Sequence, residues 1–180
     1  METIKVKNKN PHRAEIKAAR RKAAKPLLWI GIVSIVMLFA GLTSAYVVRA
    51  DNGNWLVFEL PDIAVLSTAI IVTSSLSMVV AQRAVKKDNL RLTSLALFVT
   101  LVLGLAFFYT QIEDWRQLTA KGIYFIGRYS NASGSFLYLI AAVHLAHLIG
   151  GLVALSVSLT KSLLKKYSAA DHLGLELTAI

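Results

Sequence analysis

The run Gly134-Ser-Phe-Leu-Tyr-Leu-Ile-Ala-Ala-Val-His144-Leu-Ala-His147-Leu-Ile-Gly150-Gly151 decides how this chain folds. It is apolar over a length that crosses a bilayer, because about 20 residues at 1.5 Å each cover the hydrocarbon core. His144 and His147 stand three residues apart near its middle, so on a helix both imidazoles share one face. Ionisable side chains at membrane depth face protein or trapped water rather than lipid. The run therefore predicts a membrane helix with one buried polar face, His144 and His147.

The rest of the chain repeats this apolar pattern. Of its 180 residues 56% are hydrophobic and 17% are charged, and the charged residues stand apart in blocks. Four runs are long and apolar enough to span a membrane, at about residues 27–48, 62–81, 92–111 and 135–159. We predict an all-α, polytopic transmembrane helical bundle. The bundle is expected to occupy residues 27–180, after a basic cytoplasmic tail at residues 1–26.

The positive charge marks one side of the membrane. The net charge is +10, and nine of the 20 Lys and Arg residues precede residue 27. Four more lie in residues 82–91, between the second and third predicted spans, and three in residues 160–180, after the fourth. Basic residues gather in cytoplasmic loops, so we predict a cytoplasmic N-terminus. This placement between membrane spans argues against a nucleic-acid partner.

The residues that bind metals are few. The chain has no cysteine, which excludes thiolate metal sites and disulfides. Beyond His144 and His147 the only histidines are His12, in the tail, and His172, near the inner surface. A b-type haem with two axial histidines needs them on facing helices, and a tetrahedral site needs more ligands than the spans supply. We expect no metal and no cofactor in this chain. Packing and proton-transfer roles remain open for the two imidazoles.

Four groups of residues carry a resemblance to a known family. In chain order they are Leu66-Ser67-Thr68 after Pro61, then Ala96-Leu97-Phe98 through Gly104 to Gln111 and Asp114-Trp115, then Gly134-Ser135-Phe136 with His144 and His147 ahead of Gly151, and last His172-Leu-Gly174-Leu-Glu176. In this order and spacing they resemble subunit III of the haem-copper terminal oxidases, the cytochrome c oxidase type in its short bacterial form. Gln111, Asp114, Trp115, His172 and Glu176 are the family-motif residues.

The resemblance implies a non-catalytic accessory subunit of an aa3-type cytochrome c oxidase in the bacterial plasma membrane. The complex would transfer electrons to oxygen and translocate protons, with haem and copper held by partner subunits I and II. This chain would stabilise the catalytic subunit, bind phospholipid, and support oxygen or proton access, within a larger respiratory supercomplex. Lys161 matches a position where the family often has an arginine near a lipid headgroup.

The chain also departs from the family pattern. The family's glutamate on the first of these helices is matched by Ile35, so no carboxylate is available there for proton supply. The family continues past the position of Glu176 into another membrane helix, so a fifth helix is expected beyond residue 180.

Two other classes of protein remain as alternatives. One is a stand-alone membrane b-type cytochrome, which would show haem absorbance in the isolated chain. The other is a small membrane transporter, which would show discontinuous helices or internal repeats around a midplane site. The sequence displays neither of the transporter features.

Overall fold

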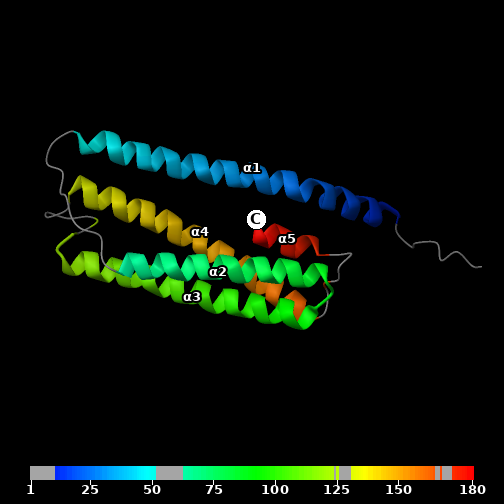
Figure 1. Ribbon diagram of the computed structural model, residues 1–180. Helices are drawn as coiled ribbons and strands as arrows, with labels where there is room; N and C mark the ends of the chain where they lie inside the picture. The colour runs from blue at the N-terminus through cyan, green and yellow to red at the C-terminus, as the bar shows by residue number, and fades with distance from the viewer. Residues whose placement is uncertain (1–10, 52–62, 124, 126–130, 165–166, 168–171) are drawn as a thin grey trace, which may run out of the picture. The chain divides into compact units, whose positions relative to one another are not determined.

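The described part of the chain folds as helices. The computed structural model describes residues 11–51, 63–123, 125, 131–164, 167 and 172–180, and within these residues it has no strand. The helices are α1 (Pro11–Ala50), α2 (Ile63–Lys86), α3 (Leu90–Ala120), α4 (Ala132–Leu163) and α5 (Leu173–Ala179) (Figure 1). Four of them are long and apolar enough to cross a membrane, over Ala18–Ala50, Val65–Lys86, Leu90–Ala120 and Ala132–Leu163. The predicted all-α class with four membrane helices is confirmed.

Two units divide the chain, residues 1–37 and residues 38–180. Within the described residues the first unit is a single helical stretch, the N-terminal part of α1. Its helix begins at Pro11 rather than at residue 27, and Pro26 lies inside it. Proline suits the first helical position, because its missing N–H has no partner there in any case. The division of the chain into a tail and a bundle at residue 27 stays a prediction.

A tight turn joins α2 to α3 in the second unit. The N–H of Asn89 donates to the carbonyl of Ala84 at 3.1 Å, and Asp88 adopts a left-handed φ of 56°. Aspartate tolerates this conformation better than most residues. The Asn89 side chain then caps α3 by accepting the N–H of Leu92 at 3.2 Å. The two helices are therefore antiparallel neighbours.

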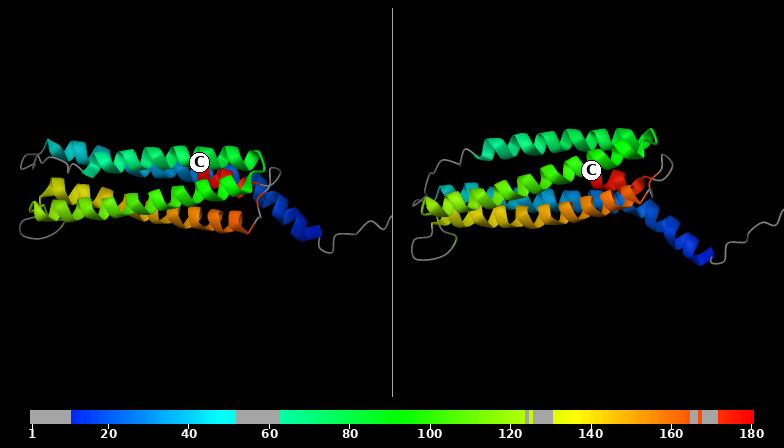
Figure 2. Two further views of the ribbon diagram at one scale, coloured as in Figure 1. Left: turned by 60° about the horizontal axis from the view of Figure 1, so that its bottom comes forward. Right: turned by 90° about the horizontal axis from the view of Figure 1, so that it is seen from below.

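Helix α3 lies between α2 and α4, and α5 packs against both α4 and α2 (Figure 2). One hydrophobic cluster forms where these four helices meet. Leu97 of α3 and Leu175 of α5 are fully buried in it, and Leu155 of α4 is 8% exposed. The cluster consists of Ala81, Val85, Ala96, Leu97, Leu155, Leu159, Tyr167 and Leu175, with Met78, Leu90 and Leu101 packed against it.

Hydroxyl groups join the same helices. Ser77 of α2 donates to the carbonyl of Ala96 at 3.0 Å. Two further hydroxyl pairs cross between helices, Ser94 with Ser162 at 2.8 Å and Ser158 with Thr178 at 2.7 Å. In a membrane such bonds contribute about 0.6–2 kcal/mol each, because water does not compete for them. They fix which helix lies beside which.

The end of α3 is set by a glycine. Gly122 has a φ of 78°. Its N–H donates to the carbonyl of Thr119 at 3.0 Å, and the N–H of Ile123 donates to the carbonyl of Leu118 at 3.1 Å. This pair of bonds is the Schellman arrangement, which needs a left-handed residue. Ile123 and Leu118 are both buried, as the arrangement favours.

Replacing Gly122 with alanine is expected to lower the free energy of unfolding by about 1 kcal/mol. The left-handed backbone conformation is strained for alanine, whereas glycine adopts it without strain. Chemical denaturation of the purified chain in detergent measures this. Gly150→Ala is the matched control, since a Cβ there meets nothing within 4 Å and the residue lies within α4. Equal stability of Gly122→Ala and the parent would contradict the structure of this turn.

Candidate functional site

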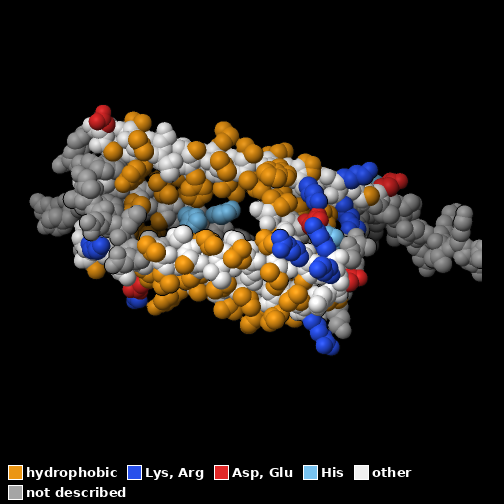
Figure 3. Space-filling view, in the orientation of Figure 1, with side chains coloured by type: hydrophobic (Ala, Val, Ile, Leu, Met, Phe, Trp, Pro, Cys, Tyr) orange, Lys and Arg blue, Asp and Glu red, His pale blue; other side chains and the backbone are white. Residues whose placement is uncertain are grey.

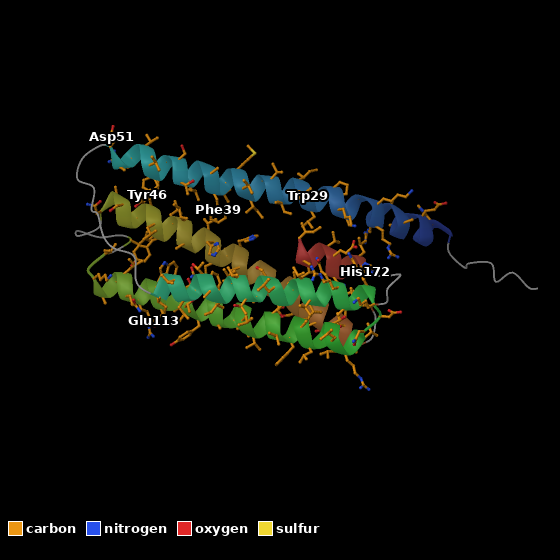
Figure 4. All side chains as sticks on the ribbon, in the orientation of Figure 1. Trp29, Phe39, Tyr46, Asp51, Glu113 and His172 are labelled. Atoms are coloured by element: carbon orange, nitrogen blue, oxygen red, sulfur yellow. The ribbon has the colours of Figure 1, made fainter. Side chains whose placement is uncertain are left out.

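His144 lies on α4 between two aromatic rings. Its ring centroid is 6.2 Å from that of Phe39, which is labelled in Figure 4, and 6.1 Å from that of Phe107, both in edge-on geometry. Phe39 comes from the part of α1 that belongs to the second unit, and Phe107 comes from α3. The imidazole therefore packs as an aromatic ring within the helices, and such pairs contribute about 0.5–1.5 kcal/mol each.

His147 is in a different setting. It is exposed, whereas His144 is half-buried, and neither imidazole has a hydrogen-bonding partner among the described residues. Figure 3 shows imidazoles in pale blue among hydrophobic side chains of the helices. Burial of the whole imidazole face stays a prediction for the assembled complex.

The ligand chemistry of the described residues is sparse. They contain no group of three His, Cys, Asp or Glu side chains that converges on one point. His144 and His147 point from one helix, which does not fit the two facing histidines of a bis-imidazole haem.

Gln111, Asp114 and Trp115 lie near the C-terminal end of α3, away from the histidines. All three are partly buried. Oδ1 of Asp114 and Nε1 of Trp115 are buried atoms with no hydrogen-bond partner in the described part of the chain. Buried polar atoms without a partner cost free energy, so these two are suited to contacts with a neighbouring chain or water.

Tyr138 holds this end of the bundle together, and sequence reasoning missed it. Its hydroxyl donates to the carbonyl of Ile123 at 2.9 Å and lies 3.0 Å from the Thr119 hydroxyl. Its ring lies 5.9 Å from Trp115 and 6.2 Å from Phe125. The available signal was a lone tyrosine in the first two turns of an apolar helix, where a buried hydroxyl requires partners.

Tyr138→Phe is expected to destabilise the chain by about 1–3 kcal/mol, because it leaves the buried carbonyl of Ile123 without its donor. Heating of the purified complex, with loss of this chain as the readout, measures the effect. Tyr109→Phe should leave the stability unchanged, since Tyr109 is 64% exposed. A Tyr138→Phe chain as stable as the parent would show that this hydroxyl contributes nothing.

His172 and Glu176 meet at the opposite end of the bundle. Nε2 of His172 lies 3.2 Å from Oε1 of Glu176, which is one turn further along, in α5. Nδ1 of His172 and the hydroxyl of Tyr167 are buried without a hydrogen-bond partner in the described residues. Lys161 is exposed in the last turn of α4. The predicted site residues thus lie in three places and do not form one pocket.

These features define a polytopic α-helical membrane protein whose polar side chains pack between helices. Comparison with known families makes this specific: the chain belongs to the cytochrome c oxidase subunit III family, whose model matches residues 14–180. It is therefore subunit III of a haem-copper oxidase, and so a subunit of an enzyme complex. The resemblance stated from the sequence motifs is confirmed.

Three relatives show the range of the family. The chain is 33% identical to the probable cytochrome c oxidase subunit 3 of Nocardia farcinica, over 81% of this chain and 71% of the relative. It is 27% identical to the haem-copper oxidase subunit I+III of Aeropyrum pernix, over 74% of this chain and 17% of that protein. It is 28% identical to the cytochrome bo(3) ubiquinol oxidase subunit 3 of Buchnera aphidicola, over 70% of this chain and 67% of that protein.

Proposed function

We propose that this chain is a non-catalytic accessory subunit of an aa3-type cytochrome c oxidase in an aerobic respiratory chain. The observation that carries the proposal is the family match over residues 14–180, joined to a bacterial relative named cytochrome c oxidase subunit 3. In this role the chain supports the stability of the catalytic subunit, and the haem and copper belong to subunits I and II.

The exposed helix faces support an assembly role. On α4, Ile149 and Val153 are 48% and 58% exposed. Lipid or partner helices cover such surfaces in a membrane. The Aeropyrum relative is named as subunits I and III in one chain, which supports subunit I as the neighbour. Docking in a larger respiratory supercomplex belongs to the same proposal.

The electron donor separates two kinds of complex. The Nocardia relative is named a cytochrome c oxidase subunit, and the Buchnera relative a subunit of a ubiquinol oxidase. The higher identity to the Nocardia protein favours cytochrome c. Oxygen consumption by the purified complex with reduced cytochrome c, compared with ubiquinol, distinguishes the two.

The charges support the proposed orientation. Arg83, Lys86 and Lys87 lie at or just after the end of α2, and Lys161 lies in the last turn of α4, at the same end of the antiparallel helices. Positive residues favour the cytoplasmic side, which supports a cytoplasmic N-terminus in a bacterial plasma membrane. Lys161 at this side is suited to a phospholipid phosphate. The proposed role also includes the access of oxygen or protons to the catalytic subunit through this chain.

A gentle detergent purification through a tag on this chain tests the proposal. We expect a-type haem bands in the optical spectrum and the catalytic and copper-bearing subunits by mass spectrometry. A chain that is purified alone with bound haem would replace this proposal with a stand-alone cytochrome. A colourless chain purified alone would favour the small transporter.

A further inference from the structure

His147 lies at the centre of α4, and its side chain is exposed. It is the sixteenth of the 32 residues of this helix, so about 23 Å of helix separates it from either end. Asn131 caps one end of the helix, and Lys161 lies in the last turn at the other. The imidazole is therefore exposed near the middle of the hydrocarbon core when α4 spans a membrane.

An imidazole at this depth needs a partner that lipid cannot provide. Neutral imidazole carries one N–H donor and one acceptor nitrogen, and an unsatisfied polar group is costly in hydrocarbon. Within the described residues no hydrogen bond reaches either nitrogen of His147. The headgroups lie about 15 Å away, and histidine has only one methylene group below its ring, so it is too short to reach them. A polar group of another membrane helix is the partner that fits this depth.

Two glycines next to His147 have no use within the described chain. Gly150 and Gly151 follow it by three and four residues, so they continue its side of the helix, and both are exposed. A Cβ added at either glycine would meet nothing within 4 Å, whereas one added at Gly104 of α3 would meet the Leu152 side chain at 2.9 Å. Packing inside the chain thus explains Gly104 but not the pair on α4.

Glycine in a helix is less stable than alanine, so an unexplained pair indicates another requirement. In membranes, small residues let the backbones of two helices approach closely. Ala154 lies one turn beyond Gly150 and is also exposed, which extends the same strip of small residues. The strip alone would suit many neighbours, but the imidazole beside it restricts the choice to a helix with a polar side chain.

We propose that His147, Gly150, Gly151 and Ala154 form a docking surface for one membrane helix of a neighbouring oxidase subunit. That helix crosses α4 closely at the two glycines, and its hydroxyl, amide or carboxyl side chain forms a hydrogen bond with His147 at mid-membrane. The proposal rests on the proposed function for the presence of neighbouring subunits, and it adds the surface and the chemistry of the contact.

Photocrosslinking of the purified complex tests the proposal. A photoreactive leucine analogue replaces Val143, which lies four residues before His147 on the same side of α4. We expect mass spectrometry to find an adduct with a membrane helix of another subunit. The matched control carries the analogue at Ile149, two residues after His147 and about 200° round the helix, and should not form this adduct. An adduct at Val143 with lipid, with this chain itself or with a second copy of it would overturn the proposal.

Two substitutions of His147 provide a second test. His147→Leu should raise the rate at which this chain is lost from the heated complex about tenfold, which corresponds to one hydrogen bond between membrane helices. His147→Gln keeps a donor and an acceptor and should remain close to the parental rate. Loss of His147→Leu at the parental rate would reject the contact, because leucine suits a lipid-facing position better than histidine. The haem spectrum and co-purified subunits of the parental complex test the proposed function separately.

Discussion

Replacing Leu97 with alanine is expected to lower the free energy of unfolding by about 2–5 kcal/mol, and to release this chain from the complex at lower temperature. Leu97 is fully buried in the cluster that joins α2, α3, α4 and α5. Removing its side-chain carbons leaves a cavity that the surrounding helices fill only in part, and their packing contacts are lost. Denaturant titration of the chain, and heating of the complex followed by separation of the subunits, measure the two effects.

Leu95→Ala provides the comparison two residues away. Leu95 lies on the same helix but is 60% exposed, so its truncation removes little packing within the chain. Leu97→Ala should therefore be much less stable than Leu95→Ala. Similar losses in the two variants would mean that the cluster of buried residues does not hold the helices together.

His144→Ala is expected to shorten the working life of the complex while leaving its initial rate of oxygen consumption unchanged. The substitution removes two edge-on ring contacts, with Phe39 and Phe107, which together contribute about 1–3 kcal/mol. The weakened packing should let this chain dissociate sooner during turnover. Oxygen-electrode traces, together with quantification of the chain in the recovered complex, separate stability from rate.

His144→Phe distinguishes ring packing from imidazole chemistry. Phenylalanine keeps a ring between Phe39 and Phe107 but has no nitrogen to bind or transfer a proton. We expect it to restore most of the working life that His144→Ala loses. Immediate, complete loss of electron transfer in a fully assembled His144→Phe or His144→Ala complex would reject the packing role.

Much of the fold followed from the sequence, because membrane spans need long uncharged runs. The span predicted at residues 92–111 falls within α3, and the span predicted at residues 135–159 falls within α4. The helix ends lay further out than predicted. The described α4 runs from Ala132 to Leu163, since hydrophobicity marks the lipid-facing length and the helix itself continues into polar residues.

The contacts between helices could not be predicted in the same way. The hydrophobic pattern of a helix does not indicate which serines of two helices will contact each other. Ser94 and Ser162 are paired only by the packing of α3 against α4. The spacing of His144 and His147 placed both on one face, but it did not reveal that rings from two other helices would flank only the first. Such details depend on tertiary packing, which a single helix pattern does not encode.

The accessory role is tested most directly by comparing the purified oxidase with and without this chain. We expect removal of the chain to leave the haem spectrum and the initial rate of cytochrome c oxidation unchanged, while activity decays sooner during turnover. Loss of haem absorbance in proportion to the chain removed would contradict it, because this subunit would then hold a redox centre.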